Sequence, residues 1–106
     1  MTHPNKNKGN NYERELVKMA QAFGIPAERA WGSDGRSFGE IAEVDPKVSD
    51  FKVQAKRKKK IPDWLRPVEG VDVQVFREDR GQSWALMSYD LFLKLTLLHE
   101  NQDNDT

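Results

Sequence analysis

The sequence of 106 residues contains no cysteine and no apolar run of about 18 residues. The lack of cysteine excludes a disulfide framework, a thiolate zinc site and a cysteine nucleophile. The lack of a long apolar run excludes a membrane-spanning helix, and because residues 1–11 are polar we expect no secretory signal. We therefore expect one small cytoplasmic domain with no membrane partner.

The net charge is zero, but the charges are unevenly distributed along the chain. Residues 1–60 hold 13 Lys or Arg against 8 Asp or Glu, and residues 61–106 hold 4 against 9. The first part therefore carries +5 and the second −5. Lys52 and the run from Lys56 to Lys60 place six cations within nine residues. Such a cluster is typical of a surface that binds a polyanion, although it also fits a solvated charged face.

Hydrophobic periodicity divides the chain into an arm, one domain and a tail. Residues 1–11 have too few apolar groups to pack, so we expect a flexible basic arm. Over residues 12–23 apolar side chains recur on one face of a helix, which Gly24 can end. We expect a single folded domain over residues 12–99, followed by a disordered acidic tail over residues 100–106.

The remainder of the domain alternates between strand patterns and turn-forming residues. Strands are predicted at 27–31, within a hairpin at 40–58, at 71–75 and at 84–87, with turns at 62–65 and 79–81. Ser88 can cap a final helix. Its buried side, in a core or a subunit interface, is assigned to Leu91, Phe92, Leu95 and Leu98. This order of elements predicts an α/β domain with a mixed central β-sheet flanked by helices.

Three polar side chains converge in the predicted hairpin. Gln54 and Lys56 are two residues apart in a predicted strand over 51–57, so both project from one face. A two-residue turn at 49–50 places Asp45 directly opposite Gln54, with Cβ atoms about 4.5–5.5 Å apart. Carboxylate and amide oxygens beside an ammonium suit Mg²⁺ and a phosphodiester, because the metal activates water and the ammonium stabilises developing negative charge.

A second register of the hairpin is also open. If residues 46–49 formed a four-residue loop, Gln54 would face Ile41, with Glu40 beside it. Glu40 would then replace Asp45 as the acidic ligand. We favour Asp45, because two-residue turns are the commoner kind in hairpins.

Several motifs follow one another along residues 8–98. They are the helical segment Lys8–Val17, the segment Arg29–Ser33, and Asp45 followed by Gln54–Lys56. Together they resemble the archaeal-type Holliday junction resolvases, which also occur in phages and prophages and belong to the PD-(D/E)xK nuclease superfamily. The resemblance implies a restriction-endonuclease-like core, Mg²⁺ with Mn²⁺ as a substitute, and a homodimer that cuts opposed strands of a four-way DNA junction symmetrically. For a phage-encoded relative, it implies the host cytoplasm.

The resemblance also implies a role for each matching residue. Glu13, Asp45 and Gln54 would act in catalysis as metal ligands, together with the backbone carbonyl of Ala55, and Lys56 would be the catalytic lysine. Lys8, Arg14, Arg29 and Ser33 would contact DNA phosphates. Further phosphate contacts are expected from the loop that contains Arg36 and from the basic run Arg57, Lys58, Lys59 and Lys60.

The chain departs from the family pattern at two positions. Most members carry Glu where Gln54 stands, so the site has one negative charge fewer and should hold Mg²⁺ more weakly. The usual Pro-Asp of the first motif is missing, which leaves Asp45 and Glu40 as alternatives. The alternative functions are a repair or recombination nuclease of the same superfamily without junction preference, and a non-catalytic DNA-binding module. No small-molecule cofactor beyond the metal is expected.

The aromatic and histidine side chains are given no catalytic role. Trp31, Trp64 and Trp84 are interpreted as core residues or dimer anchors rather than as platforms for base stacking. His3 and His99 have no partner at metal-ligand spacing.

Overall fold

The structure is a computed structural model that describes residues 4–29 and 46–104. Helix α1 spans Pro4–Ala22 and begins eight residues earlier than predicted. Proline suits the first turn of a helix, because its missing N–H would have no partner there and its φ is already helical. The prediction of a flexible arm is therefore wrong from Pro4 onward.

The apolar face of α1 is buried, as its periodicity predicts. Leu16 and Ala20 are 5% and 0% exposed. Gly24 ends the helix in the left-handed region with φ at +84°, and its amide donates a hydrogen bond to the Gln21 carbonyl at 2.9 Å. The predicted end of this helix is thus confirmed.

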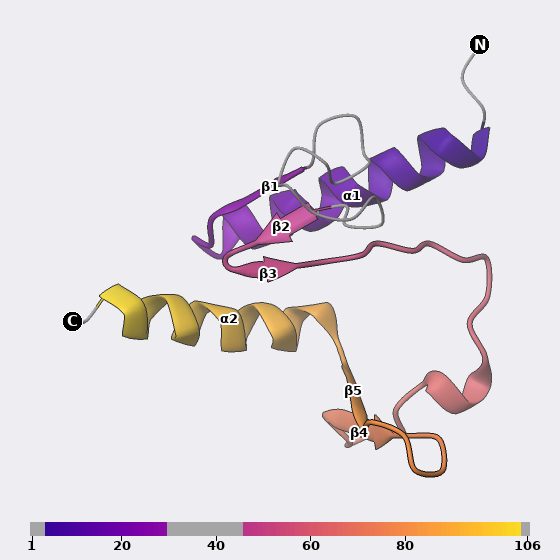
Figure 1. The fold of residues 1–106 in the computed structure, drawn as a ribbon. Coiled ribbons are helices and arrows are strands. Elements are labelled where there is room, and N and C mark those ends of the chain that lie inside the picture. Colours follow the sequence, from indigo (N-terminus) through magenta and orange to yellow (C-terminus); the bar gives the residue numbers. More distant parts are fainter. Residues whose placement is uncertain (1–3, 30–45, 105–106) are drawn as a thin grey trace.

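Three short strands lie beside α1 in the order β1-β2-β3, and both neighbouring pairs are antiparallel (Figure 1). They are β1 (Ala27–Arg29), β2 (Pro46–Val48) and β3 (Phe51–Lys52). Helix α1 packs against β1 and β2. Val48 joins Ala20, Ile25 and Leu93 in the buried core, so the core lies between this sheet and the helices.

A second antiparallel sheet pairs β4 (Val73–Phe76) with β5 (Trp84–Met87). Figure 1 shows that it lies apart from the first sheet, beyond the short helix η3 (Asp63–Leu65). The described residues are therefore mixed α/β, as expected, but they form two antiparallel sheets instead of one mixed central sheet. The linking segment carries five consecutive cations and two prolines, and like charges and missing N–H groups both oppose an extended ladder.

Helix α2 (Tyr89–Asn104) begins with the predicted cap. The Ser88 hydroxyl accepts a hydrogen bond from the amide of Leu91 at 3.1 Å. The helix continues through Asn104, so the prediction of a disordered tail from Glu100 is wrong as far as Asn104. Within residues 4–29 and 46–104, neither long helix has the length and apolar character needed to cross a membrane.

The buried face of α2 differs from the predicted one. Leu93 and Thr96 are 0% and 2% exposed, whereas Leu95 and Leu98 are 48% and 59% exposed. The Thr96 hydroxyl is accommodated in the interior because it donates a hydrogen bond to the Phe92 carbonyl at 2.7 Å. Assigning Leu95 and Leu98 to the core was therefore wrong, and their interface role stays a prediction.

Tyr89 joins the two long helices, because its hydroxyl donates a hydrogen bond to the Leu16 carbonyl at 2.9 Å. Burial, and secondarily the charge of nearby Tyr12, raises the pKa of Tyr89 from 10.0 to about 12. Unfolded tyrosine ionises near pH 10 while the folded side chain keeps its proton. The contribution of protonated Tyr89 to the free energy of unfolding is therefore fully present below about pH 10 and is lost as the pH rises through about 12.

We expect Tyr89→Phe to lower the unfolding free energy by about 1 kcal/mol at neutral pH, because a buried carbonyl loses its donor. The variant should also lose less stability than the parent between about pH 10 and about pH 12. Urea unfolding of both proteins across this range measures the effect. Parallel pH profiles would contradict this assignment of the titration to Tyr89.

Candidate active site

The described part of the first sheet ends next to the residues of the predicted site. Arg29 pairs with Pro46 across β1 and β2. The amide of Val53 donates a hydrogen bond to the Pro46 carbonyl at 2.9 Å, which extends the pairing of β2 with the β3 segment by one residue. Arg29, Pro46 and Val53 therefore form the last described row, and Asp45 and Gln54 would follow it.

The turn between β2 and β3 decides between the two registers. Val48 pairs with Phe51 across a two-residue turn, in which Ser49 has a left-handed φ of +55°. The favoured register is thus confirmed. The alternative loop over residues 46–49 is wrong, because β2 occupies most of it. Which acidic side chain serves as the ligand stays a prediction.

The segment after β3 keeps the alternation of a strand. Val53 and Ala55 are half-buried, whereas Gln54 and Lys56 are exposed. The paired strand itself ends at Lys52, so the predicted strand over 51–57 is shorter than expected. The two exposed side chains nevertheless project toward solvent, as the sequence pattern predicts.

Glu13 is a buried carboxylate that lies beside Arg29. One carboxylate oxygen, Oε2, accepts hydrogen bonds from Arg29 Nη2 at 2.9 Å and from Arg29 Nε at 3.1 Å. The two side chains are 8% and 25% exposed. The family resemblance implied a metal ligand at Glu13 and a phosphate contact at Arg29, and the structure joins these two residues in an ion pair between α1 and β1. This contact fixes the orientation of both charged groups.

Strand alternation places this ion pair and Gln54 on different sides of the sheet. Arg29 and its partner Pro46 share the face that α1 covers. Gln54 is one residue past Val53, so it projects from the opposite face. If this alternation continues past Lys52, where the paired strand ends, Glu13 and Gln54 lie at the same end of the sheet but on opposite sides of its last described row. A metal shell containing both would have to close around that end.

Most of the predicted DNA-binding residues that the structure describes are exposed. Those with exposed side chains are Arg14, Arg57, Lys58, Lys59 and Lys60. Lys8 lies in α1. Lys47 pairs directly with Lys52 on neighbouring strands, which adds two more cations near this run.

Four of the predicted or alternative site residues lie outside the described residues. They are Ser33, Arg36, Glu40 and Asp45. Within residues 4–29 and 46–104, no three His, Cys, Asp or Glu side chains gather into a group that could hold a metal ion.

Two contacts that the sequence did not indicate tie α2 to the turn between β2 and β3. His99 Nε2 lies 3.0 Å from Asp50 Oδ2, and the Ser49 hydroxyl donates a hydrogen bond to the Glu100 carboxylate. His99 was given no role, and Glu100 was placed in a disordered tail. The partners are about 50 positions apart in the chain, and no periodicity links them.

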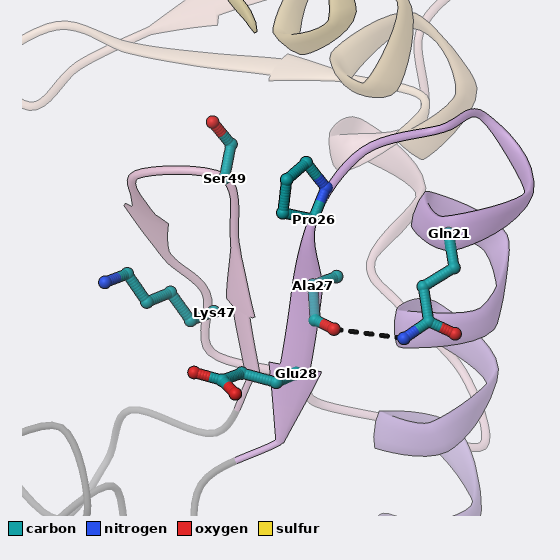
Figure 2. A pocket seen from close by; sticks show the side chains of 6 residues that line it. All are labelled: Gln21, Pro26, Ala27, Glu28, Lys47 and Ser49. Atoms are coloured by element: carbon teal, nitrogen blue, oxygen red, sulfur yellow. Dashed lines mark hydrogen bonds between the residues drawn. The ribbon is translucent and has the colours of Figure 1, made fainter.

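A hollow of about 460 Å³ opens beside β1 and β2 (Figure 2). The Gln21 side-chain amide donates a hydrogen bond to the Ala27 carbonyl at 3.1 Å along its wall. Glu28 and Lys47 are direct cross-strand partners here, an arrangement of opposite charges that stabilises a sheet. The hollow is lined by Gln21, Pro26, Ala27, Glu28, Lys47 and Ser49, none of which was predicted as a site residue.

Comparisons with protein-family models, with curated proteins and with solved structures find no match. What the structure itself defines is a mixed α/β chain with a charged sheet end and an exposed basic run.

We expect Glu13→Gln to lower the unfolding free energy by about 1–2 kcal/mol. The substitution removes the charge that faces the partly buried Arg29 guanidinium but keeps the shape of the side chain. Glu15→Gln is the matched control on an exposed position of the same helix, and it should change stability by less than about 0.5 kcal/mol. Urea unfolding compares the two variants. Equal effects would show that the ion pair adds nothing.

Proposed function

We propose that this chain is a metal-dependent, structure-selective DNA endonuclease that resolves four-way junctions by paired, symmetric strand cleavage. The observation that carries the proposal is the register of β2 and β3, because continuing this pairing by one residue would put Asp45 opposite Gln54 and near Lys56. The proposal includes a restriction-endonuclease-like core, of which the described helices and sheets would be parts.

The residues near the sheet end have the chemistry that the reaction needs. Asp45 and Gln54 offer hard oxygen ligands, and Lys56 offers an exposed ammonium two residues from the amide. A bound Mg²⁺ or Mn²⁺ would polarise the scissile phosphate and lower the pKa of an attacking water. Lys56 would stabilise the negative charge that develops on the phosphate oxygens. Glu13, held by Arg29, would orient water or complete the metal shell together with the Ala55 carbonyl.

The placement of cations supports a DNA partner. Lys47 and Lys52 are directly opposite each other on neighbouring strands, so they add positive charge beside the exposed run that begins at Lys56. The exposed run 57–60 continues from Lys56 and would follow a phosphate backbone. DNA binding should therefore weaken steeply with salt, because it rests on phosphate contacts.

Symmetric cleavage requires two active sites related by a two-fold axis, so the proposal includes a homodimer. The exposed Leu95 and Leu98 of α2 offer apolar surface for such an interface.

The proposal is tested with three end-labelled substrates, a four-way junction, a flap and a linear duplex. The account predicts paired nicks in opposed strands of the junction with Mg²⁺ and no nicks with a chelator. Equal cleavage of all three substrates would identify a repair or recombination nuclease without junction preference. No cleavage of any substrate with Mg²⁺ or Mn²⁺ would overturn the nuclease proposal.

One observation favours a second candidate, a non-catalytic DNA-binding module. The Glu13 carboxylate is engaged by Arg29 in an ion pair, so an acid that the nuclease would use as a metal ligand already has a charged partner. Such a module would bind the junction in the same assay but would leave its strands intact with either metal.

A further inference from the structure

A hollow lined with aromatic side chains lies between helix η3 and the β4–β5 hairpin. Two of its residues, Phe76 and Trp84, also line a second hollow together with Val53 and Gln54. The hollow beside η3 has a volume of about 720 Å³, within the range of sites that hold small organic molecules. The lining residues are Trp64, Phe76, Arg77, Glu78, Asp79, Gly81, Gln82 and Trp84. None of them is used by the proposed nuclease chemistry.

Two of the three aromatic rings in this hollow are open to solvent. Trp64 and Trp84 are 61% and 57% exposed, so the interpretation of both as core residues is wrong, whereas their role as dimer anchors stays a prediction. Trp31, the third tryptophan of the sequence, lies outside the described residues. Two exposed indoles at one hollow form a contiguous apolar surface, which is typical of a binding site. Isolated exposed apolar side chains carry no such indication.

Phe76 contacts the Trp64 ring and pairs with Trp84 across the hairpin. Its ring centroid lies 5.5 Å from that of Trp64, with the ring planes at 83°, and Phe76 is the direct cross-strand partner of Trp84. The Gln74 side-chain amide also donates a hydrogen bond to the Trp64 carbonyl at 2.7 Å, which ties η3 to β4. The Trp64 ring is thus braced against β4, which lowers the entropy that it would lose on binding a ligand.

Charge in the surrounding chain indicates the chemical class of the occupant. Residues 56–60 are five consecutive exposed cations, and Trp64 follows them after four positions. A cationic track that leads to exposed aromatic rings is the combination by which proteins hold single-stranded nucleic acid, with the backbone on the cations and the bases on the rings. The same track at a purely apolar protein interface would be unfavourable, because it would bury unpaired ammonium groups.

The polar wall of the hollow fits a base better than a phosphate. Glu78 and Asp79 place two carboxylates against one guanidinium, Arg77, and Asp63 adjoins Trp64. This acidic balance repels phosphate from the hollow itself. Carboxylates accept hydrogen bonds from the exocyclic amino group of cytosine, so the wall suits an amino-bearing base edge.

We propose that this hollow binds an unpaired nucleobase of single-stranded DNA by stacking on Trp64 and Trp84, while residues 56–60 hold the adjoining phosphates. The inference does not depend on the nuclease proposal, because it needs neither a metal nor cleavage.

The test is binding of two fluorescent oligomers about ten nucleotides long, an oligodeoxycytidine and a wholly abasic strand of equal charge, without divalent metal. The parent protein should prefer the base-containing strand. Trp64→Ala should weaken its binding by about 5- to 150-fold, the loss expected for one stacked base, and leave the abasic strand nearly unaffected. Trp64→Phe should restore most of the preference, because it keeps an aromatic face.

Val68→Ala is the matched control, since Val68 is an apolar residue of the same linker that is 74% exposed and does not line the hollow. It should leave the preference unchanged. Equal affinity of the parent for both strands would overturn the proposal. The proposal would also be overturned if Trp64→Ala kept the base preference and showed half the parental molar mass in light scattering. That result would identify the hollow as an interface between two copies of the chain. Circular dichroism of each variant confirms that it is folded, and junction cleavage, measured separately, tests the nuclease.

Discussion

Lys56→Ala should reduce the rate of junction cleavage by at least about 100-fold while junction binding changes only a few-fold. The ammonium of Lys56 is placed to stabilise charge that appears only in the transition state, so its removal affects the chemical step and not the ground-state complex. A denaturing gel under single-turnover conditions measures cleavage, and a native gel measures binding.

Lys58→Ala provides the matched control, because Lys58 is an equally exposed cation in the same run. It should weaken binding slightly, with a smaller salt dependence, and leave the cleavage rate of the bound junction unchanged. Cleavage by Lys56→Ala at the parental rate would remove the catalytic role of Lys56. Equal losses of cleavage in the two variants would indicate that the run serves only to bind DNA.

Asp45→Asn should lower cleavage in Mg²⁺ by at least about 100-fold, whereas Glu40→Gln should retain it. A metal ligand supports several kcal/mol of transition-state stabilisation, and each 1.36 kcal/mol corresponds to about tenfold in rate. Continuing the observed register by one residue would place position 45 opposite Gln54, which makes Asp45 the expected acidic ligand.

The two substitutions control for each other, because each removes one negative charge from the same segment of the chain. Titration of Mg²⁺ in the cleavage assay distinguishes a weakened metal site from a lost one. Excess Mg²⁺ restores cleavage if the site is only weakened and does not restore it if the site is lost. Activity that is lost in Glu40→Gln and kept in Asp45→Asn would contradict the assignment of the ligand.

Local chemistry predicted the elements whose ends depend on one or two residues. Gly24 could be recognised as the helix end because few other residues adopt its backbone conformation, and Ser88 could be recognised as a cap by its hydroxyl. The turn after Val48 followed from the preference of hairpins for two-residue turns. These signals lie within a few residues of the feature that they specify.

Features that depend on distant segments were not predictable in the same way. Helix α2 has leucine on several faces, so its sequence did not reveal that Leu93, rather than Leu95, faces Val48 and Ile25. The Glu13–Arg29 ion pair joins positions 16 apart, and each charge by itself suited a different role. Which face α1 covers is decided by packing, and that choice brought Glu13 to Arg29.

The pairing of Asp45 with Gln54 is the claim on which the proposed active site depends, and engineered cross-linking measures it most directly. The chain has no cysteine, so the double variant Asp45→Cys/Gln54→Cys contains a single possible disulfide. Lys47→Cys/Lys52→Cys, built on an observed pair, is the positive control. The account predicts that both variants oxidise to the same extent and at similar rates, because directly opposed strand residues meet disulfide geometry. A cross-link at 47 and 52 without one at 45 and 54 would contradict it.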